Sequence, residues 1–223
     1  MWSEKLFMTI LALEFSSPQR SVALARGGDV LSAAAETGGR GTNAFGLIEE
    51  VLAKAGISRS GIDCLAVGLG PGSYAGIRVA LAIAQGWQLA RGVKLLGIGS
   101  APCLAAQAQA EQLFGRVNVV IDAQRGEFYL AGYEISAAGA KEIVPLKIVT
   151  AADVESRARA EEMLIGPEVT QWFASGKTLF PSATMLARLA GGRDDFSVGG
   201  ELEPVYLRAT NFVKAAPARH LSP

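Results

Sequence analysis

The sequence predicts an α/β fold with a mixed sheet and two related halves. Strand-like apolar runs alternate with helix-like runs through the first half of the chain, which is the pattern of a sheet covered by helices. An apolar strand that ends in one carboxylate, followed by a short polar turn with an arginine and a second strand, occurs at Glu14 and again at Asp122. This repeat predicts two related subdomains, 1–114 and 115–223.

In the first half, turn chemistry and apolar periodicity place each element. The helix starting near Asn43 is amphipathic, because Phe45, Ile48 and Leu52 recur at helical spacing, and Gly56 closes it. The expected order is strands 7–13, 21–25 and 30–36, helix 43–55, strand 62–67, a long helix up to 91, strand 94–98 and helix 102–114.

The second half is shorter and less regular. A turn at 123–126 separates its first two strands, and the last residues have the composition of a loose tail. The expected order is strand 117–122, strand 127–133, a strand ending at 146, a helix within 150–162, strand 163–165, helix 182–190, an extended segment 204–208 and the tail 215–223.

The composition indicates a soluble globular protein, with 223 residues, 50% hydrophobic and 19% charged. The charges balance at 21 basic and 21 acidic residues, so the whole-protein field offers nucleic acid or a membrane surface no attraction. Cys64 and Cys103 each stand alone in apolar surroundings, which predicts buried thiols and fits a reducing, cytoplasmic setting. Neither the first strand nor the long helix reads as a signal peptide or a membrane span.

The glycine-rich segment 68–78 joins a strand to the long helix and has two interpretations. It can cradle a phosphate at the helix start, or it can serve as a tight turn with Ser73 as the helix cap. It lacks the Gly-Lys-Ser/Thr ending of a P-loop, and no acidic residue closes strand 94–98 to bind a ribose. The candidate phosphate-binding or nucleotide-binding residues are Glu14, Ser16, Ser17, Gly70, Gly72 and Ser73.

Hydrolytic and metal chemistry have little support in the sequence. The single histidine, His220, lies in the tail, which disfavours serine–histidine, cysteine–histidine and histidine–metal sites. Glu14 at its strand end could help hold a phosphate or a metal-bound water, and Asp122 could form a functional pair with Arg125. The favoured interpretation of both is a carboxylate that contacts turn amides or a neighbouring arginine. We therefore assign no catalytic residue and no metal ligand.

The long helix is apolar nearly all round, because Arg78, Gln85 and Gln88 are its only clearly polar side chains from 74 to 90. Such a helix must be covered, either as a central core helix or by a second subunit on one face. Small residues at spacings of three and four would let another helix approach it closely. The candidate interface residues, shared with helix 43–55, are Phe45, Ile48, Leu52, Tyr74, Arg78, Ala82, Gln85 and Leu89.

Four blocks in family order, spanning most of the chain, resemble the TsaB (YeaZ) family: Ile10–Ser17, Gly70–Arg78, Ile121–Tyr129 and Pro204–Arg208. The glycine block is the most specific of them. The resemblance implies an actin-like ATPase fold of two ribonuclease-H-like subdomains, the second one reduced. The chain departs from the family's usual pattern at Glu14-Phe15, where aspartate and threonine are common, and at Asn43, where many members have histidine.

The resemblance also implies a function. The chain would be a non-catalytic subunit in the synthesis of threonylcarbamoyladenosine in tRNA, docking on and activating the catalytic subunit TsaD through helices of the first subdomain. TsaE would be a further partner, a homodimer would form when the chain is alone, and contact with tRNA would be indirect or weak. No tightly bound cofactor is expected, and ATP or ADP would bind only in the complex.

Two other functions remain open from the residues. One is an autonomous ATPase or small-molecule kinase of the same fold, with Glu14, Ser16, Ser17 and the loop 70–73 around the phosphates. The other is a glycoprotease-type peptidase, for which the sequence offers no nucleophile and base pair.

Overall fold

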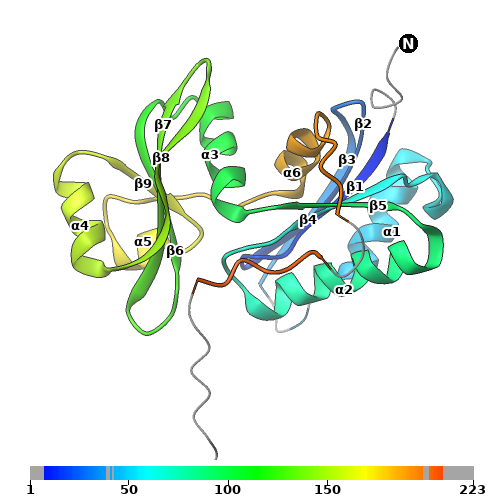
Figure 1. The fold of residues 1–223 in the computed structure, drawn as a ribbon, viewed down its shortest axis with the longest axis horizontal. Helices are drawn as coiled ribbons and strands as arrows, with labels where there is room; N and C mark the ends of the chain where they lie inside the picture. The colour runs from blue at the N-terminus through cyan, green and yellow to red at the C-terminus, as the bar shows by residue number, and fades with distance from the viewer. Residues whose placement is uncertain (1–7, 39–40, 42, 198–200, 208–223) are drawn as a thin grey trace, which may run out of the picture.

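The computed structural model describes residues 8–38, 41, 43–197 and 201–207, and these form two lobes (Figure 1). Each lobe is built on a five-stranded sheet, with strand orders β3-β2-β1-β4-β5 and β10-β9-β6-β7-β8. In each sheet the first three strands in sequence pair antiparallel, and the two later strands join parallel to them. The repeat expected around Glu14 and Asp122 thus extends to the whole of both sheets.

The strands of the first lobe are β1 (Thr9–Glu14), β2 (Gln19–Arg26), β3 (Asp29–Thr37), β4 (Cys64–Gly68) and β5 (Lys94–Ile98). Those of the second are β6 (Gly115–Asp122), β7 (Glu127–Ser136), β8 (Gly139–Thr150), β9 (Met163–Gly166) and β10 (Lys177–Thr178). The helices are α1 (Ala44–Ala55), the 3₁₀ turn η2 (Arg59–Gly61), α2 (Tyr74–Arg91), α3 (Ser100–Ala110), α4 (Ala151–Arg159), α5 (Val169–Trp172) and α6 (Ala183–Ala190).

The helix ends follow local chemistry that the sequence already shows. Gly56 ends α1 in the left-handed conformation, with φ of 65°, and Gly92 ends α2 with φ of 67°. Ser73 caps the start of α2, its hydroxyl accepting the N–H of Gly76 at 3.4 Å. The predicted helix 102–114 instead begins at Ser100, because a proline is tolerated in the first turn of a helix.

Helices cover both faces of the first sheet, which explains why its central strands are apolar throughout. Leu11 and Leu13 of β1 pack beneath α1 and α2, whereas Ile10 and Ala12 point to the opposite face and pack with Leu186 of α6. Because α6 lies on the first sheet, one division after residue 114 separates the two sheets but assigns α6 to the wrong lobe.

The second face of the first sheet also holds both cysteines. Cys64 and Cys103 are buried there as free thiols, as expected. Burial raises the pKa of Cys64 to about 12, with smaller effects of nearby Lys94 and Asp63, so this thiol stays protonated.

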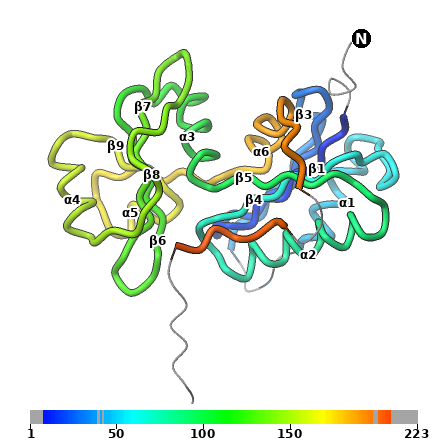
Figure 2. Tube along the Cα trace, in the orientation of Figure 1, coloured from blue at the N-terminus to red at the C-terminus, as the bar shows by residue number. Residues whose placement is uncertain are grey.

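The last described residues, 201–207, return to the first lobe and are called the return segment. Leu202 is buried beside Leu69, and the N–H of Val205 donates to the Leu69 carbonyl at 2.9 Å. Figure 2 shows the segment beside the start of α2, where the rings of Tyr206 and Tyr74 lie 5.7 Å apart. The expected tail 215–223, with His220, lies outside the described residues.

Within the described part of the chain, no helix combines the length and the apolar character needed to cross a membrane.

Candidate functional site

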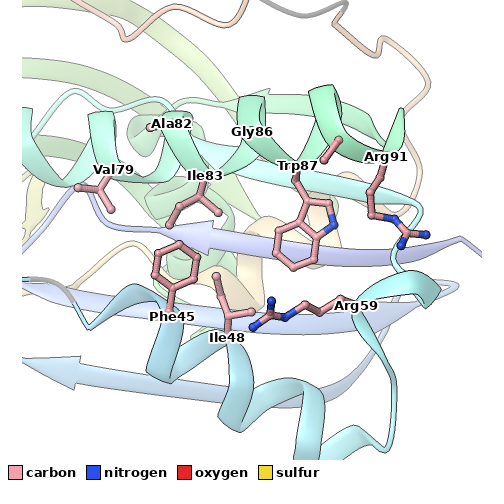
Figure 3. Close-up of a pocket in the computed structure, with 10 residues that line it drawn as sticks. Phe45, Ile48, Arg59, Val79, Ala82, Ile83, Gly86, Trp87 and Arg91 are labelled. Atoms are coloured by element: carbon pink, nitrogen blue, oxygen red, sulfur yellow. The ribbon is translucent and has the colours of Figure 1, made fainter.

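An apolar groove runs between α1 and α2, on the outer side of the first lobe. Its volume is about 630 Å³. In Figure 3, Ile83 and Trp87 point from α2 toward α1, and Phe45 and Ile48 point back toward α2. The residues that line it are Phe45, Ile48, Arg59, Val79, Ala82, Ile83, Gly86, Trp87, Ala90 and Arg91.

The helix α2 has one apolar face in the core and another at the surface. Ile77, Ala80 and Ala84 are buried against the sheet, whereas Val79 is 37% and Leu89 is 90% exposed. One face of α2 is therefore a core face, as the first interpretation of its composition expects, and another presents apolar side chains at the surface. Coverage of that exposed face by a second subunit stays a prediction.

The structure sorts the candidate interface residues into three groups. Phe45, Ile48 and Ala82 line the groove, whereas Leu89 is exposed and is not one of its lining residues. Leu52 is the correction: it is only 4% exposed and packs in the core, because α1 turns this position toward the sheet.

The other three candidates lie on α2. Tyr74 and Arg78 stand together at its start, where the Arg78 guanidinium lies 4.1 Å from the centre of the Tyr74 ring. Gln85 is half-buried in the middle of the helix. None of the three lines the groove.

Sequence reasoning missed two large side chains of the groove, Ile83 and Trp87. Their signal was present, because Val79, Ile83 and Trp87 follow one another at spacings of four on α2. The interface prediction instead selected Ala82 from the adjacent row of the same helix, because small residues at that spacing would let another helix approach closely.

One end of the groove is basic. Arg59 lies there and donates from Nε to Oε1 of Glu49 at 2.9 Å, an exposed ion pair of about 0–1 kcal/mol. Arg91 reaches the same end from α2, and its guanidinium donates to the Ser60 carbonyl oxygen at 3.4 Å. The groove is thus apolar along its length, with two guanidinium groups at one end.

A second cavity, of about 730 Å³, lies between the lobes and has charged side chains of both signs in its lining. Arg20 and Arg125 contribute positive charge to it, and Asp122 and Glu168 contribute negative charge. Burial, and then the nearby Asp122 carboxylate, raise the pKa of Glu168. The remaining lining residues are Ser16, Pro18, Gly38, Gly72, Ser73, Tyr74, Ile121, Ala123, Gln124, Tyr129 and Tyr206.

Only half of the candidate phosphate residues reach this interlobe cavity. Ser16, Gly72 and Ser73 line it, whereas Glu14, Ser17 and Gly70 do not. Glu14 is fully buried behind the loop. Its Oε1 accepts the N–H of Ser16 at 2.7 Å, and its Oε2 has no hydrogen-bond partner among the described residues.

Burial gives the Glu14 carboxyl an unusual pKa. Removal from water raises this pKa to about 7, against the smaller opposing effect of hydrogen bonds with Ser16. A Cβ at Gly68 would overlap Glu14 Oε2, so the neighbouring strand closes over the carboxyl. Glu14 therefore does not face the cavity, which corrects the expectation that it could help hold a phosphate or a metal-bound water there.

The glycines of the loop serve a close approach within the chain itself. A Cβ at Gly72 would overlap the Ser16 carbonyl oxygen, and the Ser73 N–H donates to that same oxygen at 2.6 Å. This amide, at the start of α2, is thus already paired. Such use of the loop favours the tight-turn interpretation over the phosphate cradle.

Within the part of the chain that the structure describes, no group of three histidine, cysteine, aspartate or glutamate side chains is placed to hold a metal ion.

Comparison with known proteins identifies the relatives of this fold. Residues 41–219 match the family model described as "TsaD: tRNA N6-adenosine threonylcarbamoyltransferase". The solved structure of YeaZ from Pseudomonas aeruginosa superposes with a TM-score of 0.76 at 27% identity, covering 90% of this chain and 100% of that one. These likenesses show the actin-like fold.

Curated sequences agree. The Escherichia coli "tRNA threonylcarbamoyladenosine biosynthesis protein TsaB" is 35% identical over 40% of this chain and 38% of its own length. The Haemophilus influenzae protein of the same name is 36% identical over 56% and 53%. The matched regions thus span about half or less of these two relatives.

A further relative matches over a longer stretch. An uncharacterized protein of Mycobacterium tuberculosis is 31% identical over 70% of this chain and 69% of its own length. Together with the match of the family model to most of the chain, these relatives decide the family. The chain belongs to the TsaB (YeaZ) family, within the group of proteins that the TsaD model describes.

Proposed function

We propose that the chain takes part in threonylcarbamoyladenosine biosynthesis as an accessory subunit, and that it docks on and activates a TsaD-type catalytic subunit through the α1–α2 groove. The names of the curated relatives support the pathway. In this proposal a TsaE-type ATPase and any ATP or ADP act in the assembled cytoplasmic complex, and tRNA contacts chiefly the catalytic subunit. A second copy of the chain covers the groove when the partner is absent.

The observation that carries the docking proposal is the exposure of large apolar side chains around one groove. Phe45 is 64% exposed, and Val79 and Leu89 add apolar surface from α2. Contiguous apolar patches of several hundred Å² on a soluble domain mark interaction sites. The apolar lining with a charged end also has the composition of an interface core with a polar rim.

The accessory role is supported by two groups near the interlobe cavity that are not free to contact a phosphate. Glu14 is sealed behind the glycine loop, and the Ser73 amide is paired within the chain. A phosphate-transfer site needs charged groups and amides that are free to contact the phosphates. Catalysis is therefore assigned to the partner.

The direct test is binding of the purified chain to the TsaD-type subunit of the same organism, by calorimetry and in a tRNA modification assay. Phe45→Glu and Val79→Glu place charge on the groove and are expected to weaken binding at least a hundredfold. Ile143→Glu is the matched control, because Ile143 is 43% exposed on the second lobe. Wild-type chain that neither binds nor supports modification overturns the proposal, as does equal binding by all three variants.

A second candidate, an autonomous nucleotide-dependent enzyme, is favoured by one observation. Arg20 Nε is buried beside the interlobe cavity without a hydrogen-bond partner among the described residues, as expected of a group that awaits an anion. Titration with Mg-ATP separates the candidates. Tight binding and turnover by the isolated chain, both lost in Arg20→Ala, would favour the enzyme, and their absence removes it.

A further inference from the structure

We propose that the interlobe cavity binds a free α-amino acid as its zwitterion, with the carboxylate on Arg20 and the ammonium group between Asp122 and Glu168. The inference is independent of the docking proposal, because none of these three residues lines the α1–α2 groove. It differs from the nucleotide candidate in the chemistry of the ligand, which here is a small molecule with one charge of each sign.

Arg20 supplies a buried cationic donor that the chain does not use. It lies near the start of β2, and its Nε is buried with no hydrogen-bond partner among the described residues. Glu36 stands opposite it in the β2–β3 register, where a carboxylate could form an ion pair. Oε1 of Glu36 instead accepts the N–H of Asn43 at 2.9 Å. A buried guanidinium donor without a partner costs free energy that an anionic group in the cavity would recover.

The second lobe supplies the opposite charge. Asp122 ends β6, Glu168 directly precedes α5, and both line the cavity. The oxygens of Asp122 accept N–H groups of Gln124 at 2.7 and 3.0 Å, which are neutral donors and leave the negative charge in place. Burial, and then the charge of Asp122, raise the pKa of Glu168, so the two carboxylates repel each other. A bound ammonium group would relieve this repulsion.

The charge balance of the cavity favours a zwitterion over a phosphate. The two arginines of the lining, Arg20 and Arg125, are matched by these two carboxylates, so the lining is neutral when all four groups are ionised. A phosphate group brings about two further negative charges, and the Ser73 amide at the start of α2 is already paired. A zwitterion adds no net charge, and its planar carboxylate matches the fork of a guanidinium group.

The turn between β6 and β7 is held in an unfavourable conformation at this cavity. Gln124 and Arg125 both have left-handed φ, of 64° and 61°, although neither is glycine. Residues in such conformations cluster at ligand sites, and both of these line the cavity. Its volume of about 730 Å³ is that of a small-molecule site. Tyr74 and Tyr206 in the lining offer aromatic surface to the side chain of the ligand.

The experiment screens the free proteinogenic amino acids one at a time against the purified full chain, by thermal shift and then by calorimetry. The tightest binder is compared with its amide, which lacks the carboxylate charge, and with its N-acetyl derivative, which lacks the ammonium charge. Inorganic phosphate and Mg-ATP are titrated in parallel. We expect the amino acid to raise Tm and each derivative to bind at least tenfold more weakly, because each has lost one charged contact.

Variants separate the two ends of the ligand. Arg20→Gln and Glu168→Gln should each weaken binding of the amino acid at least tenfold. The amide derivative should lose little further affinity in Arg20→Gln, because its carboxylate charge is already gone. Arg20→Lys keeps the charge without the fork, and it replaces Arg20→Gln if that variant fails to fold. Arg159→Gln is the matched control and should bind like wild type, since Arg159 pairs with Glu155 at an exposed site outside the cavity.

The outcomes distinguish the ligand chemistries. If no amino acid binds, or if the best one binds wild type and Arg20→Gln equally well, the inference is wrong. Equal binding of the N-acetyl derivative would reveal a site for a simple carboxylate and overturn the zwitterion. Tight binding of phosphate or Mg-ATP that is lost in Arg20→Gln would overturn it in favour of the nucleotide candidate. The docking proposal is decided separately, by the affinity for the TsaD-type subunit.

Discussion

The backbone N–H of Ser73 donates to the carbonyl oxygen of Ser16 at 2.6 Å, which ties the start of α2 to the end of β1. The next turn of the helix is equally close, because Gly76 lies against the Phe15 carbonyl oxygen. These contacts fix α2 over the sheet. They therefore set the position of the face that α2 presents beside α1.

Gly76→Ala should destabilise the chain by about 2–4 kcal/mol, because the new Cβ overlaps a backbone carbonyl that cannot move without shifting β1. Urea unfolding measures the change. Gly86→Ala is the matched control in the same helix, and it should change stability in the opposite direction. Equal effects of the two substitutions would contradict the close packing at Gly76.

The raised pKa of Glu14 predicts that the free energy of unfolding falls as the pH rises. Burial raises its folded-state pKa from 4.5 to about 7, so the folded chain keeps a proton that the unfolded chain has released. Its stabilising contribution is complete below about pH 4.5 and is lost as the pH rises to about 7, a change on the order of 3 kcal/mol.

The test is the difference in unfolding free energy between wild type and Glu14→Gln across this range. The amide cannot ionise, so the fall attributed to Glu14 should be absent from the variant. Glu203→Gln, at an exposed position of the return segment, serves as the control and should follow wild type. A parallel pH profile for Glu14→Gln would show that Glu14 is not the group responsible.

Glu162 in the second lobe should show the opposite dependence on pH. Burial acts against its charge, but hydrogen bonds from Asn118 at 2.9 Å and Arg157 at 3.2 Å prevail and lower its pKa. Its contribution is present above the unfolded pKa of 4.5 and is lost as the pH falls through the lowered folded pKa.

Glu162→Gln should accordingly lower the free energy of unfolding by about 1–2 kcal/mol near neutral pH and by less in acid. Urea unfolding at both pH values measures this. Glu155→Gln is a suitable control, because Glu155 forms a similar but exposed pair with Arg159. A cost for Glu162→Gln that does not shrink in acid would contradict the assigned charge.

Much of the fold could be predicted because its signals are local. Buried strands such as β1 and β4 read as apolar runs, and Ser73 and Gly92 mark the ends of α2 through their own chemistry. The repeated hairpins at Glu14 and Asp122 also predicted the relation between the two sheets.

What could not be predicted depends on residues far apart in the sequence. The placement of α6 on the first sheet follows from contacts between Leu186 and β1 residues, which no local pattern encodes. The sealing of Glu14 depends on Gly68 of the adjacent strand. Apolar periodicity on α1 likewise could not separate Leu52, which faces the sheet, from Phe45, which faces solvent.

That last distinction gives a prediction about the two faces of the helical layer. Leu52→Ala removes a core side chain and should lower the unfolding free energy by about 2–4 kcal/mol, with affinity for the TsaD-type subunit unchanged while the chain is folded. Leu89 is 90% exposed, so Leu89→Ala should change stability by less than about 0.5 kcal/mol and weaken binding about tenfold. Denaturant unfolding and calorimetry on both variants measure the two quantities. If Leu52→Ala weakened binding as much as Leu89→Ala without loss of stability, the face assigned to the partner would be wrong.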